Sequence, residues 1–496
     1  MLSACSEKGD DRLRHIEEFS EINNENYSIN TKAIYKNIAN LIKTEGVSLA
    51  SDRHVIKYYS ENKPFIWIHR LGVYDRADTL LKIIKDADYY GFSTRMLKVE
   101  QIKEDLNRIK NLNVSSNGIN DINNVLARLE YNLTRAFFRY SSGLRYGLIN
   151  PDYLYNNLET SDTDSTGIKF KQLSDLQIER PNNKFYTSII SKALNDSIKY
   201  LFNNIQPKNE LYVKLIEYLN DNRLSNKERL KTICNIERCR WRLKILSGKN
   251  RFDKFVEVNI PSFSLKAVNN NAALTMRIGC GTLKYKTPLL TSKITRMDIN
   301  PQWIIPKSIA KGIASSYQYM HKMGMFVMDK KFGKLPPEKA SYTKIINGEQ
   351  FIIQAGGPKN SLGRIIFRFD NNFSVFLHDT SSPWLLKRED RAISHGCIRV
   401  EKPLELALFL LDDKTEELED NLRYSMTVEF INENDSLNKK IIDKKRILKS
   451  IFVNPAIPLF ISYFTKYLNE NGEIVDYQDV YKYDEALYDK LKPFIE

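Results

Sequence analysis

The sequence lacks long apolar runs, paired cysteines and any nucleic-acid-binding motif. No apolar run approaches the ~20 residues that a membrane-spanning helix needs, so the chain as given is not expected to cross a bilayer. Its five cysteines are an odd number, which argues against a disulfide framework. They also lack the paired spacing of a structural zinc site. Hydrophobic residues at 42% and charged residues at 27% are typical of a soluble globular protein.

Length and charge set the outer limits. A chain of 496 residues exceeds a single ordinary core, so two or three domains are expected. Lysine and arginine number 75 against 61 acidic residues, a formal charge of +14. Such a balance suits nucleic acid, an anionic membrane or an acidic polymer. Because the basic residues are spread along the chain, a solvated basic surface is the default, and no nucleic-acid partner is predicted.

The pattern of apolar residues changes near residue 250. From 26 to 249 the chain reads as mostly helical, and one apolar stripe at helical spacing is punctuated by Gly143 and Gly147. Beyond 250 short strands dominate, which predicts an α+β multidomain protein, helical first and β-rich afterwards. The stripe comprises Ile122, Leu126, Leu129, Leu133, Phe137 and Tyr140. The predicted strands are 255–260, 263–268, 274–278, 294–299 and 365–369.

The one stretch that reads as chemistry places a thiol and two imidazoles within twenty residues. Ser394-His395-Gly396-Cys397-Ile398-Arg399-Val400 follows His378-Asp379-Thr380. Residues 373–378 alternate as a strand that His378 ends. Gly396 permits a tight turn before Cys397, and Pro403 begins a helix. A nucleophile on such a turn is both exposed and rigid.

These residue types suit acyl transfer by a cysteine. A thiol with an ordinary pKa of ~8.5 is only a few per cent ionised near neutrality, so it needs a base, and we assign His378 to that role. His395 is expected to tune the thiol or hold the substrate. The backbone N–H groups of Gly396 and Cys397 are candidates for an oxyanion hole. Arg399 is a candidate to bind a substrate carboxylate.

This signature resembles that of the YkuD-type L,D-transpeptidases, bacterial enzymes that cross-link peptidoglycan stem peptides, and the wider sequence resembles their large YcbB-like branch. The resemblance covers about half of the chain strongly and the N-terminal part weakly. Supporting segments are Gly357-Pro358-Lys359-Asn360-Ser361-Leu362-Gly363-Arg364, Thr287-Pro288, Asn300-Pro301-Gln302-Trp303-Ile304-Ile305-Pro306, Asn235-Ile236-Glu237-Arg238-Cys239-Arg240-Trp241 and 463–481.

The resemblance implies a ping-pong reaction on peptidoglycan. Cys397 attacks the diamino acid carbonyl of a donor tetrapeptide and expels D-alanine, and an acceptor amine resolves the thioester into a 3→3 cross-link. Carbapenems are expected to acylate Cys397, and neither a metal nor an organic cofactor is implied. The implied catalytic residues are Cys397, His378, His395 and Gly396, and the substrate-binding ones Arg399, Ser394, Phe376 and Trp303. Phe376 departs from relatives that often have tyrosine there, so the corresponding hydroxyl is missing.

The expected domains follow from the pattern of apolar residues and from the same resemblance. They are a tether (1–25), a helical scaffold (26–249), an L,D-transpeptidase catalytic domain with peripheral helices (250–430) and a C-terminal extension packed on it (431–496). A stretch at 308–344 aligns with a substrate-capping loop, and its four methionines suit either a flexible lid or a packed core. Family members often insert a peptidoglycan-binding module, but Leu201 to Lys231 is too short for one. Substrate capture is then left to the catalytic domain and scaffold.

The N-terminus carries a localisation signal. Leu2-Ser3-Ala4-Cys5 resembles a bacterial lipobox, which makes Cys5 a candidate lipid-attachment site. The charged and apolar regions of a signal peptide are missing upstream, so either the start is misplaced or truncated or the match is accidental. We expect a lipoprotein of the cell envelope, membrane-associated through its anchor, with its active site facing the periplasm.

Four other interpretations stay open. Free cysteine is often buried, so Cys397 is alternatively a core residue. His378, His395, Cys397 and Asp379 are also legitimate zinc ligands. A carboxypeptidase or cysteine amidase would share the thioacyl intermediate but resolve it with water. A non-enzymatic wall-binding scaffold would leave Cys397 unreactive toward carbapenem.

Overall fold

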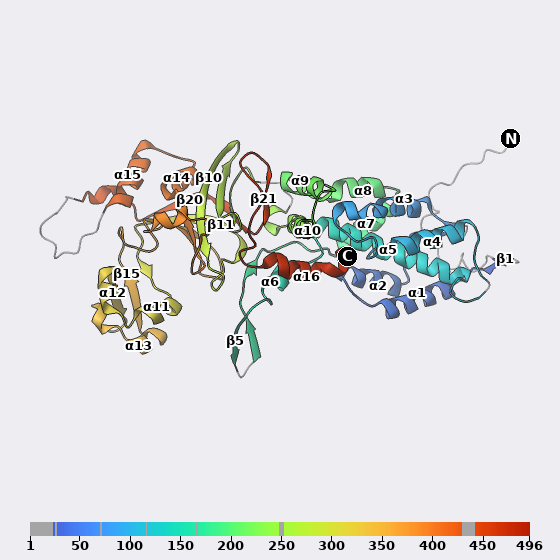
Figure 1. Cartoon of the computed structure of the whole chain (residues 1–496), viewed down its shortest axis with the longest axis horizontal. Coiled ribbons are helices and arrows are strands. Elements are labelled where there is room, and N and C mark those ends of the chain that lie inside the picture. Colours follow the sequence, from blue (N-terminus) through green and yellow to red (C-terminus); the bar gives the residue numbers. More distant parts are fainter. Residues whose placement is uncertain are drawn as a thin grey trace.

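The chain is elongated, with helices at one end and a β-sheet near the other (Figure 1). Three separate hydrophobic cores lie along it. Cys5 and nearly all of the expected tether lie outside the described residues, as do residues 429–441. The computed structural model describes residues 23–24, 27–69, 72–115, 117–164, 167–247, 252–428 and 442–496.

The helical end is built around α5 (Ile122–Tyr146), which contacts α1, α2, α3, α4 and α8. All six residues of the predicted stripe are buried, so that prediction is confirmed. Asp121 caps the start through Asn123 N–H and Asn124 N–H, and Gly147, at φ +76°, ends the helix. Gly143 lies inside the helix instead, where an added Cβ would meet Phe92 at 2.7 Å. The other helices here are α1 (Thr31–Glu45), α2 (Ala50–Ser60), α3 (Asp75–Lys85), α4 (Val99–Lys110), α6 (Pro151–Tyr155), α7 (Asn183–Leu194), α8 (Ile198–Ile205), α9 (Glu210–Leu219) and α10 (Asn226–Arg240).

The β-rich part is a sheet that closes on itself. Its strand order is β16-β17-β19-β10-β9-β8-β20-β11-β7, and an additional β16–β11 pairing joins two strands far apart on that path. β18 pairs with β10 off the path, and α14 (Pro403–Leu410) starts at the predicted proline. The strands are β7 (Ser174–Asp175), β8 (Lys254–Asn259), β9 (Ser264–Asn269), β10 (Ala272–Gly281), β11 (Leu289–Ile299), β16 (Ile365–Phe369), β17 (Leu377–His378), β18 (Ala392–Ser394), β19 (Ile398–Val400) and β20 (Ser450–Ser462). Two-stranded pairs elsewhere are β1 (Asn23–Asn24) with β2 (Tyr27–Ser28), β3 (Ile68–His69) with β4 (Gly72–Val73), and β5 (Thr160–Asp164) with β6 (Gly167–Phe170).

The predicted strand 373–378 is mostly wrong. Only Leu377 and His378 form β17, because Ser374 takes a left-handed conformation at φ +54°. Asn371 receives the backbone N–H groups of Phe373 and Val375 on its side-chain oxygen, at 3.0 and 3.2 Å. These bonds hold a turn where the alternating pattern predicted a strand.

The C-terminal segment differs from the expected extension because it supplies a strand of the sheet itself. β20 lies between β8, to which it is parallel, and β11, to which it is antiparallel. After it come β21 (Lys466–Leu468), β22 (Ile474–Asp476) and α16 (Tyr483–Ile495). The core of the sheet also includes Leu215 of α9 and Ile236 of α10. These two helices therefore pack against the sheet as well as following the scaffold in the sequence.

The expected capping loop is a folded subdomain, drawn in yellow in Figure 1. It has a four-stranded sheet in the order β12-β15-β13-β14 and a core of its own. Met320 and Met325 are buried in that core, which favours the packed interpretation of the methionines. The elements are β12 (Trp303–Ile304), α11 (Lys307–Ile313), α12 (Tyr317–Lys322), β13 (Met325–Asp329), β14 (Gly333–Leu335), α13 (Tyr342–Ile346) and β15 (Gln350–Gln354). We call residues 303–354 the cap.

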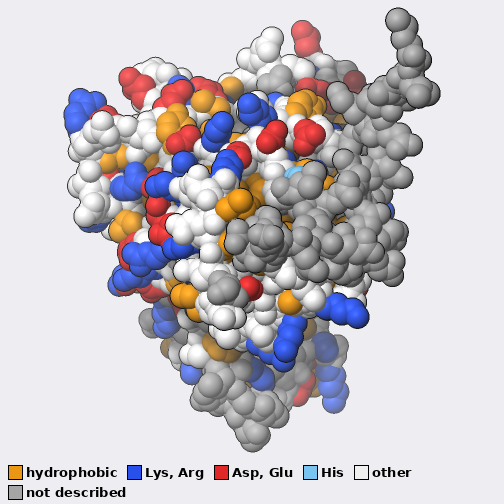
Figure 2. Space-filling view, turned by 90° about the vertical axis from the view of Figure 1, so that its right-hand side faces the viewer, with side chains coloured by type: hydrophobic (Ala, Val, Ile, Leu, Met, Phe, Trp, Pro, Cys, Tyr) orange, Lys and Arg blue, Asp and Glu red, His pale blue; other side chains and the backbone are white. Residues whose placement is uncertain are grey.

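The surface of the scaffold end shows no single-sign patch in the view of Figure 2. Lysine and arginine side chains are interspersed there with aspartate and glutamate. Such interspersion is typical of a solvated surface. Among the described residues, no helix combines the length and apolar character that crossing a membrane requires.

Candidate active site

Two neighbouring strands bring the segments that carry the predicted thiol and the predicted base side by side. β17 and β19 run parallel, with Leu377 opposite Ile398 and His378 opposite Arg399. Ile398 N–H donates to Phe376 O at 2.9 Å, so Cys397 directly precedes the paired segment. The sequence spacing of 19 residues is therefore closed by strand pairing, as a strand and a returning loop predict.

The turn before Cys397 is held by Ser394. The Ser394 hydroxyl donates to Cys397 O at 2.6 Å and accepts Gly396 N–H at 3.1 Å. Gly396 has φ +114°, a conformation that favours glycine. The predicted oxyanion donor Gly396 N–H is thus already bonded, whereas Cys397 N–H makes no backbone or side-chain hydrogen bond within the described part of the chain. Ser394 is buried and acts here on its own turn.

A second set of hydrogen bonds links this turn to Thr287 and to the C-terminal segment. Thr287 Oγ1 donates to Gly396 O at 2.8 Å and accepts Gly281 N–H at 2.9 Å. Tyr481 Oη accepts Thr287 N–H at 3.0 Å and donates to Gly281 O at 2.7 Å. The C-terminal segment thus reaches the backbone beside the candidate nucleophile, a link that the sequence analysis missed.

Tyr481 is fixed in turn by the junction with α10. Its N–H donates to Tyr463 Oη at 2.7 Å, and Tyr463 donates to Asp479 at 2.6 Å. The two quoted segments around Asn235 and Thr465 meet here, since Asn235 Nδ2 donates to Thr465 Oγ1 at 2.8 Å. A shared structural junction therefore accounts for both segments.

His378 is buried and neutral. Burial, reinforced by the charge of Arg399, lowers its pKa to about 4, although carbonyl groups of Asp379 and Leu362 partly offset the shift. Nδ1 lies 2.5 Å from Asp379 O, a partner that assigns the proton to Nδ1 and the lone pair to Nε2. No hydrogen bond of the described residues joins this ring to Cys397 Sγ.

Asp379 fixes the strand end that carries this histidine. Its carboxylate accepts Arg364 N–H at 2.7 Å and its own neighbour Thr380 N–H at 2.7 Å. Burial raises the pKa of Asp379, and those backbone donors counteract the rise. An added Cβ on Gly363 would lie 2.4 Å from this carboxyl, which explains the glycine.

Cys397 is half-buried and remains a thiol at rest. Burial raises its pKa, while the Phe376 backbone and the Arg399 charge act in the opposite direction. The other described cysteines, Cys234, Cys239 and Cys280, are also unpaired and have pKa values raised by burial.

Arg399 carries an uncompensated charge. Burial lowers the pKa of its guanidinium, and its Nε is buried without a hydrogen-bond partner. Within the described ranges no carboxylate forms an ion pair with it. The same charge lowers the pKa values of His378, His395 and Cys397, so these groups share one electrostatic environment. A half-buried guanidinium without an acidic partner is suited to bind an anion.

The side chains of the remaining predicted residues make other contacts. His395 is exposed, and its ring packs on Tyr285 at 4.5 Å between centroids. Burial, Arg399 and Lys284 lower its pKa. Phe376 is half-buried under the Arg368 guanidinium at 4.6 Å. Trp303 begins β12 and packs on the core of the cap, not on the turn that bears the cysteine.

No metal centre is formed by these side chains. In the ranges that the structure describes, no three histidine, cysteine or acidic residues are arranged to hold a metal ion. The alternative of zinc at His378, His395, Cys397 and Asp379 therefore has no geometric support.

Comparison with known proteins matches this site to a catalytic family. Residues 253–418 match the YkuD family, described as the L,D-transpeptidase catalytic domain, and residues 53–219 match a family described as the scaffold domain. The chain thus carries a YkuD-type L,D-transpeptidase catalytic domain, a domain of cell-wall acyltransferases, behind a scaffold domain. It is 24% identical over 365 residues to a Haemophilus influenzae protein named "Putative L,D-transpeptidase", covering 71% of this chain and 69% of that protein.

Proposed function

We propose that this protein forms 3→3 peptidoglycan cross-links through a Cys397 thioacyl-enzyme, and that it belongs to the YcbB-like branch. The observation that carries the proposal is the parallel pairing of β17 with β19. By this pairing, His378 and the unpartnered Arg399 lie opposite each other on adjacent strands, and Cys397 directly precedes the second of these strands. The family match supplies the reaction class.

Donor binding comes first in this scheme. A tetrapeptide stem carries carboxylates, and Arg399 has a half-buried guanidinium with no counter-charge among the described residues. A substrate carboxylate there would form charge-assisted hydrogen bonds. It would also offset the Arg399 charge that now lowers the pKa of His378. Substrate binding therefore makes the imidazole a stronger base.

Acylation then follows from the paired neutral groups. A His378 pKa of about 4 and a raised Cys397 pKa leave thiol and imidazole uncharged before substrate arrives. His378 Nε2 takes the thiol proton after a small side-chain movement, and sulfur attacks the diamino acid carbonyl. Cys397 N–H stabilises the oxyanion. The bond to D-alanine breaks, and the imidazolium returns the proton to the leaving amine.

Deacylation regenerates the enzyme. The side-chain amine of an acceptor stem attacks the thioester, the C–S bond breaks and a new amide forms. His378 takes the proton that the amine loses, and it passes to the departing sulfur. Water in place of the amine would give the carboxypeptidase reaction.

The remaining parts of the proposal are a periplasm-facing site, acylation by carbapenems and lipid anchoring at Cys5, which lies outside the described residues.

The test uses purified protein and tetrapeptide-containing muropeptides. We expect wild type to produce dimers with release of D-alanine, while Cys397→Ala and His378→Ala each abolish dimer formation. Thermal unfolding should be nearly unchanged in Cys397→Ala and shift to lower temperature in His378→Ala, because His378 is buried. Cys239→Ala, which removes another half-buried free thiol, and His321→Ala, which removes a histidine of the cap, are matched controls with activity retained.

Intact mass after carbapenem treatment reports the nucleophile directly. A single adduct is expected on wild type and on Cys239→Ala and none on Cys397→Ala. Dimer formation by Cys397→Ala would refute the assigned nucleophile. Tripeptide product without dimers would favour the carboxypeptidase, and an unreactive wild-type protein would favour a wall-binding scaffold.

A further inference from the structure

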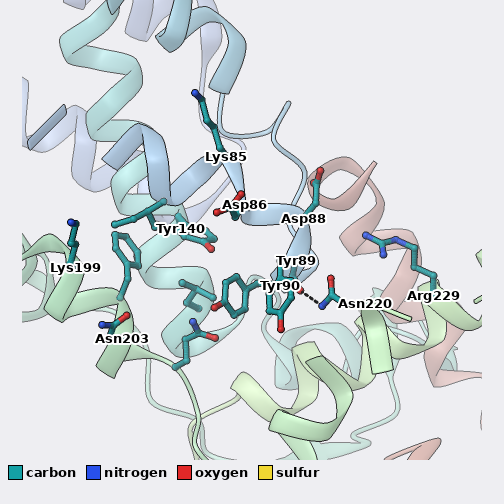
Figure 3. A pocket seen from close by; sticks show the side chains of 14 residues that line it. Lys85, Asp86, Asp88, Tyr89, Tyr90, Tyr140, Lys199, Asn203, Asn220 and Arg229 are labelled. Carbon is teal, nitrogen blue, oxygen red and sulfur yellow. Dashed lines mark hydrogen bonds between the residues drawn. The ribbon is translucent and has the colours of Figure 1, made fainter. Parts of the chain in front are cut away.

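The scaffold end contains a cavity of about 780 Å³, away from the cysteine (Figure 3). Its walls come from α3, α5, α8 and α10, from Asn220 after α9, and from the short 3₁₀ helix Ala87–Tyr90. Such a volume lies within the roughly 300–1,000 Å³ of small-molecule sites. None of the residues assigned to acyl transfer lines it.

The cavity is lined on one side by apolar and aromatic groups. Tyr140 and Phe202 pack with ring centroids 5.2 Å apart, and Ile83 and Leu144 complete this floor. The Tyr140 ring is buried, and its hydroxyl makes no hydrogen bond within the described part of the chain. A polar atom without a partner at the floor of a cavity is available to a ligand.

The rim is polar and nearly balanced in charge. Three basic residues and two acidic ones line it, and none of the five forms an ion pair among the described residues. In Figure 3, Lys199 and Asn203 lie on one side and Arg229 on the other. The charged residues are Lys85, Asp86, Asp88, Lys199 and Arg229.

An aromatic wall joins the floor to the rim. Tyr89 is 44% exposed and meets Tyr90 edge to face, with centroids 5.0 Å apart. Asn220 Nδ2 donates to the backbone carbonyl of Tyr89 at 3.0 Å, shown dashed in Figure 3. This bond holds the backbone that carries the Tyr89 ring. A rigid tyrosine ring at a cavity mouth offers an apolar face at a low cost in conformational entropy.

We propose that this cavity binds the amino-sugar backbone of the wall polymer, a ligand class distinct from the stem peptides that reach Cys397. Pyranose rings present C–H faces that pack on aromatic rings, and peripheral hydroxyl and acetamido groups that pair with carboxylates, amides and ammonium groups. The aromatic floor and the ion-pair-free rim meet both needs. The near balance of rim charge suits an uncharged sugar and not a strongly anionic polymer. The choice of this glycan rests on the proposed function.

Calorimetric titration of the full chain with the β-1,4-linked tetramer of N-acetylglucosamine tests the proposal. We expect saturable binding by wild type, weakened at least ~10-fold by Tyr89→Ala, which removes an aromatic contact, and by Asp86→Ala, which removes a hydrogen-bond acceptor. Tyr200→Ala is the matched control, because Tyr200 is 63% exposed on α8 and does not line the cavity. Its binding should equal that of wild type.

The result is independent of catalysis. Cys397→Ala should bind the sugar tetramer as wild type does, so a failure of acyl transfer and a failure of sugar binding are separate outcomes. Absence of saturable binding by wild type would overturn the inference. Equal binding by all variants would do the same, as would displacement of the tetramer by free stem peptide.

Discussion

Buried charges are treated differently at the two ends of the molecule. In the scaffold, Asp52 receives Arg139 through two hydrogen bonds of 2.7 and 2.8 Å. Glu130 accepts the backbone N–H groups of Ile66 and Trp67 at 2.6 and 2.9 Å. On β19 of the large sheet, by contrast, the Arg399 guanidinium has a buried Nε without a partner.

Paired buried charges stabilise the fold, whereas an unpaired charge such as Arg399 is available to bind a ligand. A buried charge with a partner is strongly destabilising when that partner is removed. A buried charge with no partner already carries a desolvation cost, so its removal costs the fold little. Stability and activity should therefore respond in opposite ways to substitutions at the two ends.

The largest effect is expected for Asp52→Asn. The variant leaves Arg139 buried without a carboxylate and leaves nearby Arg135 with Glu45 as its remaining acidic partner, and we expect the free energy of unfolding to fall by roughly 3–5 kcal/mol. Urea denaturation measures this loss. The control is Asp78→Asn, which breaks the more exposed pair with Lys110 and should cost within about 1 kcal/mol. Equal losses in both variants would remove the distinction between paired buried and surface charges.

Arg399→Gln tests the other side of the comparison. Loss of one partner of a charge pair formed with the donor carboxylate should reduce kcat/KM on the order of 10²-fold or more, from roughly 2–5 kcal/mol. The free energy of unfolding should change by less than about 1 kcal/mol, since the charge has no partner to lose. Steady-state kinetics and urea denaturation of the same preparation give both values. A stability loss as large as that of Asp52→Asn would assign Arg399 to the fold instead.

Glu130 should make the free energy of unfolding depend on pH. Burial raises the pKa of Glu130 from 4.5 to about 7. Because this pKa is raised on folding, the associated stability is complete below about pH 4.5 and is lost as pH rises through about 7. Relative to Glu130→Gln, wild type should lose on the order of 3 kcal/mol across that window. Unfolding free energies at pH 4.5 and 7.5 measure the difference, and exposed Glu100→Gln should show none.

The smallest effect is expected for Tyr481→Phe, because Tyr481 contributes both to stability and to the turn before Cys397. The variant leaves Thr287 N–H and Gly281 O without their shared hydroxyl, at a cost of about 1–3 kcal/mol. The turn before Cys397 should loosen, so carbapenem acylation slows several-fold. Tyr488→Phe, on α16, is the control and should keep the wild-type rate. An unchanged acylation rate in Tyr481→Phe would limit its role to stability.

Local patterns were sufficient for much of the fold. The apolar stripe of α5 was predicted, and the strands β8, β9 and β16 were predicted within one residue at each end. β10 and β11 were predicted at about half their length, since they run over 272–281 and 289–299. Their periodicity is set by short-range geometry that the sequence carries directly. The segment 373–378 shows the limit, since the side chain of Asn371 bonds the backbone and converts an alternating pattern into a turn.

Long-range pairings were not predictable in this way. Nothing in residues 450–462 says that β20 inserts between β8 and β11, nor that β16 pairs with β11. The cap was expected as a loop because its short elements bury their apolar residues only against one another. Tyr481 and Thr287 both lie in segments that carry the family resemblance, but their contact across 194 residues of chain was not predicted.

The sequence by itself indicated the reaction class, because its cysteine, histidine and glycine motif resembles that of the YkuD family. It also determined the division into helical and β-rich parts, because side-chain periodicity is local. Only the tertiary structure decided that Gly396 N–H is consumed by Ser394, that His378 is neutral and that Arg399 lacks a partner. Burial and hydrogen-bond pairing depend on which distant strands become neighbours, and those neighbours exist only in the folded chain.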